Sequence, residues 1–161
     1  MMNDKIRVLL SEEEVAKRIK EMGDVISSDY EGRPLHLICI LKGGVFFTCE
    51  LAKRISLPLT LDFMSVSSYG AGTVSSGIVK IVKDLDEPIE GKDVLIVEDI
   101  IDSGNTLSYL IEVLKQRNPR SIELCTLLDK PERRVKKQVT VKYTCFTVPD
   151  QFIVGYGLDY D

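Results

Sequence analysis

The sequence predicts an α/β protein: a mostly parallel sheet flanked by helices and extended by one long antiparallel hairpin. Apolar runs rich in β-branched residues alternate along the chain with segments that carry apolar residues at helical spacing. Three of these apolar runs end in loops rich in glycine, acidic or basic residues, which is typical of the ligand edge of a parallel sheet. The 161 residues are enough for one domain with a sizeable core, and we expect a single domain over 1–161.

The first half of the chain opens with a helix. Ser11 and Glu14 have the spacing of a capping box, and an apolar stripe follows that ends within residues 27–32. The stripe consists of Val15, Ile19, Met22 and Ile26. Next, we expect a strand, a glycine turn, a helix and a second strand at 35–41, 42–44, 45–55 and 59–67.

Residues 68–77 are rich in glycine and serine around Tyr69, and apolar strand-like residues follow at 78–83. We expect strands 59–67 and 78–83 to pair antiparallel, with residues 68–77 as a long connection between them. Loops of this kind are often lids, and Tyr69 favours a lid over a plain hairpin connection.

The second half continues the alternation. A turn region at 84–92 leads into a buried strand that starts at Val94, and a helix follows with Leu107, Leu110, Ile111 and Leu114 on one face. We expect further strands at 121–128 and 143–148. Phe152, which lies in an apolar run after the last of these, is by default a core residue.

Residues 94–106 carry the chemistry. Glu98 and Asp99 follow four apolar residues, and a loop of small polar residues around Gly104 leads into the helix. The first turn of a helix has unpaired N–H groups and suits a phosphate, to which Ser103 and Thr106 add hydroxyl donors. The two carboxylates would repel a phosphate beside them and suit sugar hydroxyls or magnesium. Together, these preferences describe a site for a phosphorylated ribose.

Two other phosphate-binding motifs are absent from the sequence. The chain has no G-x-x-x-x-G-K-[ST], which excludes a P-loop nucleotidase, and Gly70 and Gly72 lack the third glycine of a dinucleotide fingerprint. The phrase 95–99 also resembles the first strand of a response-regulator receiver, but too little chain follows it for that fold. An ordinary capped loop is the remaining structural alternative. For Lys42, spacing alone favours a solvated lysine in a turn.

Composition narrows the class of protein. Apolar residues make up 44% and charged residues 29%, and the net charge of −4 argues against nucleic acid as the main partner, although residues 130–137 contain five Lys or Arg. We expect no membrane partner, because neither a membrane-spanning run nor a signal peptide is present. The cysteines at 39, 49, 125 and 145 lack C-x-x-C spacing, so we expect buried thiols and a cytoplasmic location. His36 is interpreted as structural.

Several motifs resemble, in the same order, those of the hypoxanthine-guanine phosphoribosyltransferases, which belong to the type I phosphoribosyltransferases. The matching phrases cover nearly the whole chain: 41–44, 62–63, 67–70, 94–106, 128–131 and 149–160. The resemblance implies the type I phosphoribosyltransferase fold, with a small hood built from the chain ends. It also implies a purine-salvage reaction in which phosphoribosyl pyrophosphate and a 6-oxopurine base form a nucleoside monophosphate and pyrophosphate. Mg²⁺ accompanies the pyrophosphate.

Roles follow from the resemblance residue by residue. Asp102 would be the general acid/base that exchanges the purine N7 proton. The 5′-phosphate would bind to Asp102, Ser103, Gly104, Asn105 and Thr106. Ribose hydroxyls or the metal would be held by Glu98 and Asp99, with Asp159 near the metal. Pyrophosphate would contact Lys42 and Gly43, commonly through a cis peptide after Leu41. The purine would meet Lys130, Phe152, Ile153 and Asp159, and the lid would close with Ser68 and Tyr69.

The sequence also departs from the family pattern. Family members continue beyond residues 158–160 with an arginine that contacts pyrophosphate and a final strand, whereas this sequence stops at Asp161. The expectation is weaker pyrophosphate binding, with Arg134 as a candidate stand-in. The alternatives are a nucleic-acid-binding regulator on the same fold and a tail-less, catalytically silent domain. The family forms dimers and tetramers, so a homodimer or homotetramer is expected.

Overall fold

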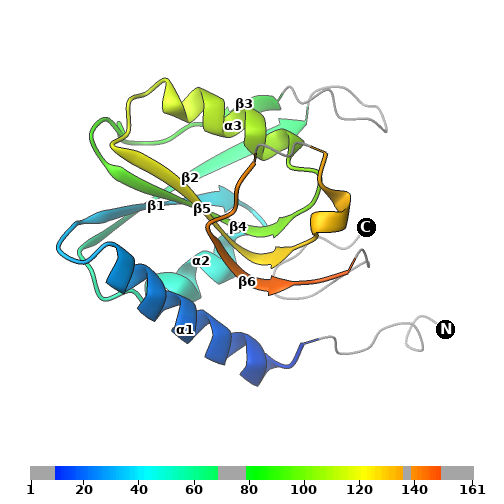
Figure 1. The fold of residues 1–161 in the computed structure, drawn as a ribbon. Helices are drawn as coiled ribbons and strands as arrows, with labels where there is room; N and C mark the ends of the chain where they lie inside the picture. Colours follow the sequence, from blue (N-terminus) through cyan, green and yellow to red (C-terminus); the bar gives the residue numbers. More distant parts are fainter. Residues whose placement is uncertain (1–9, 69–78, 136–138, 150–161) are drawn as a thin grey trace.

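The computed structural model describes residues 10–68, 79–135 and 139–149, which form alternating strands and helices (Figure 1). The helices are α1 (Glu12–Asp29), α2 (Val45–Ala52), α3 (Asn105–Lys115) and the short 3₁₀ helix η2 (Pro131–Arg133). The strands are β1 (Leu35–Leu41), β2 (Leu59–Ser68), β3 (Val79–Lys83), β4 (Asp93–Ile101), β5 (Ser121–Asp129) and β6 (Tyr143–Thr147).

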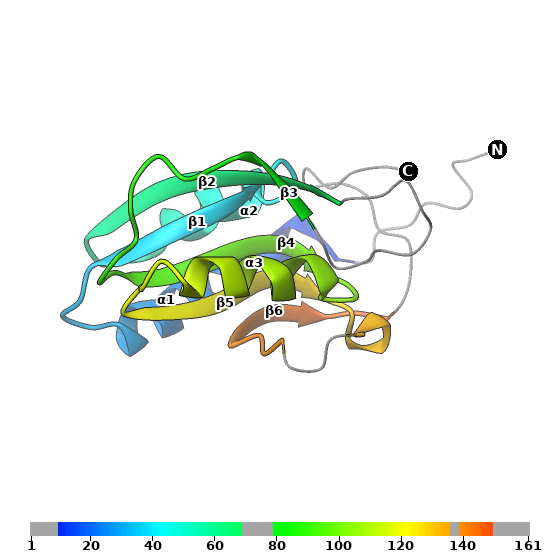
Figure 2. The same cartoon turned by 90° about the horizontal axis from the view of Figure 1, so that it is seen from above.

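The six strands form one sheet in the order β3-β2-β1-β4-β5-β6. Only β3 runs antiparallel to its neighbour, so five strands direct their carboxyl ends to the same edge (Figure 2). The mostly parallel sheet and the antiparallel pair of β2 and β3 are therefore confirmed. The order in which strands are added to the sheet reverses between the parallel neighbours β1 and β4. Ligands of open α/β sheets bind beyond the strand ends at such a switch point.

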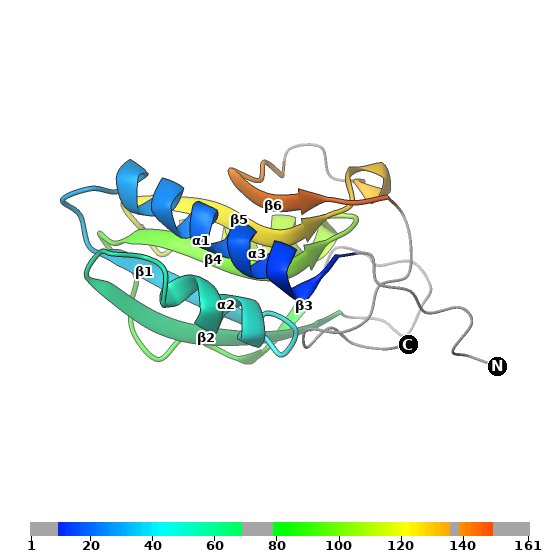
Figure 3. The ribbon, with the colours of Figure 1, turned by 90° about the horizontal axis from the view of Figure 1, so that it is seen from below.

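Helices cover both faces of the sheet. One core cluster joins α1 and α2 to the sheet through residues such as Ile26, Phe47 and Leu95, and both helices lie on the near side in Figure 3. A second cluster packs Leu107, Leu110 and Leu114 of α3 against the opposite face. Because β4 lies between these two layers, its residues 94–97 are all buried, which explains why its sequence shows no polar alternation.

The expected helix at the start of the chain is confirmed. Ser11 caps α1: its Oγ accepts from the Glu14 backbone N–H at 3.1 Å, and the Glu14 carboxylate accepts from the Ser11 N–H at 3.0 Å. Ile19, Met22 and Ile26 of the apolar stripe are buried. The local sequence signal and the tertiary packing therefore agree for this element.

Two boundaries differ from the sequence prediction by more than one residue. Helix α2 ends at Ala52 rather than at Ile55, because the chain tightens into three-residue turns in which Arg54 N–H donates to Leu51 and Ile55 N–H to Ala52. Strand β4 continues through Glu98 and Asp99 to Ile101, so the two carboxylates lie within the strand rather than after it. Parallel pairing with β5 holds these last residues extended.

Gly44 lets the turn after β1 pack closely against the backbone of β1 and β4. A Cβ at this position would lie 2.8 Å from the Ile40 carbonyl oxygen and 3.3 Å from that of Val97, both backbone atoms of central strands. We expect Gly44→Ala to lower the free energy of unfolding by about 1–3 kcal/mol, the usual cost of overpacking. Urea denaturation would measure this, and an unchanged midpoint would show that the strands yield to the methyl group at no cost.

His36 is a buried, structural histidine, in agreement with the sequence interpretation. Its ring Nδ1 lies 2.6 Å from the Thr60 hydroxyl, and the side chain is only 2% exposed. Burial lowers the pKa of His36 below the ordinary value of 6.5, and Lys92 lowers it further, although Asp62 and Glu87 oppose this. The folded protein therefore holds the neutral ring, whereas the unfolded chain gains a proton below pH 6.5.

A pH dependence of stability follows. Because the pKa is lower in the folded than in the unfolded state, the free energy of unfolding should fall as the pH drops from about 7 to 5.5. This is the only histidine of the chain, so His36→Gln should flatten the slope in that window. Urea titrations of both proteins at several pH values would test this, and equal slopes would assign the effect to other groups.

Two further expectations can be compared with the structure. All four cysteines are free, and three of them, Cys39, Cys125 and Cys145, are buried, as expected for structural thiols. In the described part of the chain, no helix combines the length and apolar character that crossing a bilayer requires. The hood from the chain ends and the lid connection fall outside the described residues.

Candidate active site

The site is built where β1 and β4 end side by side. The Leu41–Lys42 peptide is cis, as the family resemblance implies. Gly43 follows, and a Cβ there would overlap the Asp99 carboxylate, so only glycine lets the turn approach this side chain. The turn after β1 and the acidic end of β4 therefore form one continuous surface.

Glu98 and Asp99 are fixed by the backbone of their own strand. A Glu98 carboxylate oxygen accepts from the Asp99 N–H at 3.1 Å, and an Asp99 oxygen accepts from the Ile100 N–H at 2.7 Å. Burial raises the pKa of Glu98 well above its ordinary range, and the adjacent Asp99 raises it further. Two acidic groups this close and this poorly solvated favour a bound cation or hydroxyl donors beside them.

Residues 102–106, named here the phosphate loop, connect β4 to α3. Gly104 is the N-cap of α3 and adopts a left-handed conformation with φ of 82°, which glycine tolerates best. The Asn105 N–H donates to the Ser103 hydroxyl at 3.3 Å, and the Ser108 N–H to the Gly104 carbonyl at 2.8 Å. The first turn of α3 therefore sits at the carboxyl edge of the sheet, where its N–H groups suit an anion.

Lys130 reaches the phosphate loop from the end of β5. It is 8% exposed, and its Nζ lies 3.9 Å from an Asp102 carboxylate oxygen. Its own N–H donates to the Ile101 carbonyl at 3.0 Å, which ties the end of β5 to the end of β4. The Asp102 side chain is about half exposed, at 47%, so it remains open to a ligand.

Apart from Ser68, the predicted site residues that the structure describes lie together at three strand ends. Gly43, in the turn after β1, lies against Asp99 of β4, and Asp102 lies beside Lys130. Ser68 is the last residue of β2, on the side of β1 away from β4. The remaining predicted site residues, Tyr69, Phe152, Ile153 and Asp159, lie outside the described residues.

Sequence reasoning missed three contributors, namely Thr126, Asp129 and Val135. The hydroxyl of buried Thr126 lies 2.9 Å from the Leu128 carbonyl oxygen, to which it donates, and 3.3 Å from that of Asp99. Asp129 pairs with Arg134, and the Val135 N–H donates to the Ser103 carbonyl at 2.8 Å. An acidic residue at a strand end with an arginine five residues later was the available signal, but a run of charges usually indicates a solvated face.

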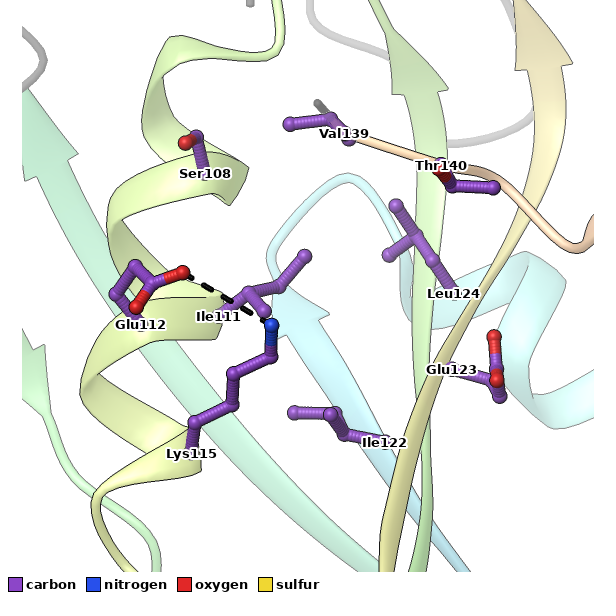
Figure 4. Close-up of a pocket in the computed structure, with 9 residues that line it drawn as sticks. All are labelled: Ser108, Ile111, Glu112, Lys115, Ile122, Glu123, Leu124, Val139 and Thr140. Atoms are coloured by element: carbon purple, nitrogen blue, oxygen red, sulfur yellow. Dashed lines mark ion pairs between the residues drawn. The ribbon is translucent and has the colours of Figure 1, made fainter. Parts of the chain in front are cut away.

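A separate hollow of about 200 Å³ lies between α3 and β5 (Figure 4). Apolar side chains such as Ile111, Ile122 and Leu124 line it, and Lys115 pairs with Glu112 at 3.9 Å at its side, where both side chains are more than half exposed. None of the predicted site residues that the structure describes contributes to this hollow. Chemistry is therefore expected at the strand ends.

A sheet covered by helices on both faces, a helix N-terminus at the switch point and acidic side chains beside it define a class of protein that binds phosphorylated sugars or nucleotides. A model of the phosphoribosyl transferase domain matches residues 8–161. The hypoxanthine-guanine phosphoribosyltransferase of Bacillus subtilis is 52% identical over 160 residues, covering 99% of this chain and 88% of that protein. This chain belongs to the phosphoribosyltransferase family, among the hypoxanthine-guanine phosphoribosyltransferases.

Solved structures agree with this assignment. A crystal structure of a hypoxanthine phosphoribosyltransferase from Staphylococcus aureus matches with a TM-score of 0.94 and 49% identity, covering 99% of this chain and 86% of that one. Some relatives are much longer. The bifunctional protein TilS/HprT of Listeria innocua is 53% identical over 160 residues, and this chain spans only 24% of its length.

Proposed function

We propose that this chain transfers a phosphoribosyl group from phosphoribosyl pyrophosphate to N9 of hypoxanthine or guanine, releasing pyrophosphate. One observation carries this proposal. The Nζ of the buried Lys130 lies 3.9 Å from a carboxylate oxygen of Asp102, the first residue of the phosphate loop. At one edge of the sheet, the arrangement supplies a cation for an oxygen of the base, a carboxylate for a proton of the base and N–H groups for a phosphate.

Binding of the ribose phosphate uses the loop and the strand end. The 5′-phosphate would bind the N–H groups at the start of α3 and the hydroxyls of Ser103 and Thr106. Glu98 and Asp99 would accept from the ribose hydroxyls. In this orientation the anomeric carbon faces the turn after β1, where Lys42 and the Gly43 backbone would hold the departing pyrophosphate.

The chemical step breaks the bond between C1′ and a pyrophosphate oxygen and forms the bond between C1′ and N9. The base loses one proton as it becomes a nucleotide, and Asp102 would accept it from N7. Lys130 would donate to the O6 oxygen, which selects oxopurines because the amino group of adenine cannot accept this hydrogen bond. The predicted purine contacts Phe152, Ile153 and Asp159 and the lid residues Ser68 and Tyr69 remain part of the proposal.

Magnesium fits the donor set of this chain. Among the described residues, no group of three or more His, Cys, Asp or Glu could hold a metal by itself. Glu98 and Asp99 nevertheless offer two carboxylates, and Mg²⁺ commonly binds one or two carboxylates together with substrate phosphates and water. When bound, Mg²⁺ would neutralise the charge of the leaving pyrophosphate.

A spectrophotometric assay tests the function. Purified protein is incubated with phosphoribosyl pyrophosphate and Mg²⁺, with hypoxanthine, guanine, xanthine or adenine supplied in turn. Turnover of oxopurines that is far faster than turnover of adenine would support the proposal. Absence of turnover with every base, under conditions in which the Bacillus subtilis relative is active, would refute it.

We also propose a homodimer or homotetramer located in the cytoplasm. The four free cysteines support a reducing compartment. Phe46 and Leu61 are exposed apolar side chains, at 52% and 45% respectively, which an interface between copies would cover. Light scattering coupled to size-exclusion chromatography measures the mass in solution, and the mass of a single chain would exclude the oligomer.

A further inference from the structure

The segment 129–135, at the end of β5, contacts three successive carbonyl groups, which belong to the last residue of β4 and the first two residues of the phosphate loop. The Ile101 carbonyl accepts from the Lys130 N–H at 3.0 Å. The Asp102 carbonyl accepts from the Arg134 Nε at 3.2 Å, and the Ser103 carbonyl accepts from the Val135 N–H at 2.8 Å. Two of these donors belong to the backbone, and only Arg134 donates through its side chain.

Peptide geometry gives these contacts a consequence. In a trans peptide the C=O of one residue and the N–H of the next point in opposite directions. Three carbonyls that face segment 129–135 therefore direct the N–H groups of Asp102, Ser103 and Gly104 to the other side of the loop. N–H groups oriented in advance in this way form an anion-binding concavity.

Arg134 is itself held in place. Its guanidinium pairs with the Asp129 carboxylate, and both side chains are only 14% exposed. Its aliphatic stem lies behind the left-handed glycine of the loop, because a Cβ on Gly104 would lie 3.1 Å from the Arg134 Cδ. A charge-assisted pair with little solvent around it holds its geometry better than an exposed pair.

We propose that Arg134 is a positioning residue that orients the Asp102–Ser103 peptide so that the phosphate loop binds the 5′-phosphate and presents Asp102 to the base. It acts through the loop and does not contact substrate, so it is distinct from the sequence-based suggestion that it replaces a pyrophosphate-binding arginine. This inference rests on the proposed function. It assigns the ion pair of Arg134 and Asp129 to preorganisation of the loop.

Four variants of the full chain test the proposal. Arg134→Met keeps the aliphatic stem and removes the guanidinium, and Arg134→Lys keeps the charge without the planar fork. Asp129→Asn keeps an acceptor oxygen but loses the charge. Arg120→Met is the matched control, because it makes the same substitution in a side chain that is 62% exposed and lies directly before β5, at the opposite end of that strand.

Arg134→Met should lower kcat/KM for phosphoribosyl pyrophosphate by about 10²-fold, the cost of misplacing reacting groups by roughly 1 Å. Arg134→Lys should recover part of this loss, and Arg120→Met should stay close to the parent protein. Combining Arg134→Met with Asp129→Asn should add little to the Arg134→Met effect, because the two residues act as one unit. Equal values for the Arg134→Met and Arg120→Met variants would overturn the proposal.

A second readout does not depend on catalysis. Amide hydrogen exchange at residues 102–106 should speed up in Arg134→Met while the central strands stay protected, and titration with inosine monophosphate should show weaker binding. Exchange that accelerates equally throughout the protein would indicate a merely structural role and overturn the proposal. If the parent protein lacked turnover, the proposed function would fail, but exchange at the loop would still decide the role of Arg134.

Discussion

Replacing Asp102 with asparagine should lower kcat by about 10²- to 10⁴-fold, the usual contribution of a general acid/base. Asparagine has nearly the same shape, so the Asp102 backbone carbonyl should still accept from Arg134 and the phosphate loop should keep its form. The amide cannot take up the N7 proton of the base. Steady-state kinetics with hypoxanthine and saturating phosphoribosyl pyrophosphate would measure the loss.

Nucleotide binding should change much less than kcat. Because the loop is intact, Asp102→Asn should bind inosine monophosphate within a few-fold of the parent protein, and its stability should be unchanged. Asp86→Asn is a suitable control, since it removes one carboxylate from a side chain that is 76% exposed. If Asp102→Asn retained full kcat, the proton transfer would have to be assigned to another group.

Replacing Lys130 with methionine should alter substrate selection. The variant keeps the aliphatic stem, which fills a largely buried position, and loses the donor to O6. A hydrogen bond to a charged group contributes roughly 1.5–3 kcal/mol, so kcat/KM for hypoxanthine should fall by about 10- to 150-fold. Turnover of adenine should not fall in parallel, because the 6-amino group gains nothing from the lysine.

The ratio of the two activities is the informative quantity. Loss of Lys130 also removes the partner 3.9 Å from Asp102, which affects both bases alike, whereas the O6 contact affects only oxopurines. Parallel kinetics with hypoxanthine and adenine separate the two effects. Lys17→Met is the control, because this lysine is exposed on the surface of α1. An unchanged ratio would mean that Lys130 does not read the base.

Local signals in the sequence predicted most of the secondary structure. The capping box of Ser11 and Glu14, the stripe on α1 and the uninterrupted apolar residues 94–97 each predicted an element that the structure contains. They succeeded because capping and periodic burial depend on residues close together in the chain. Boundaries were less certain where partners from elsewhere intervene, as when pairing with β5 extends β4 through Glu98 and Asp99.

The features of the candidate site also fall into two groups, those set by local sequence and those set by tertiary contacts. The sequence by itself determined the phosphate loop, the acid pair and the turn after β1, because each lies within one continuous stretch. Only the tertiary structure decided that β1 lies next to β4, that Lys130 reaches Asp102 and that Arg134 pairs with Asp129 behind the loop. The physical reason is strand order: which strand ends meet depends on non-local pairing and burial, which sequence spacing does not encode.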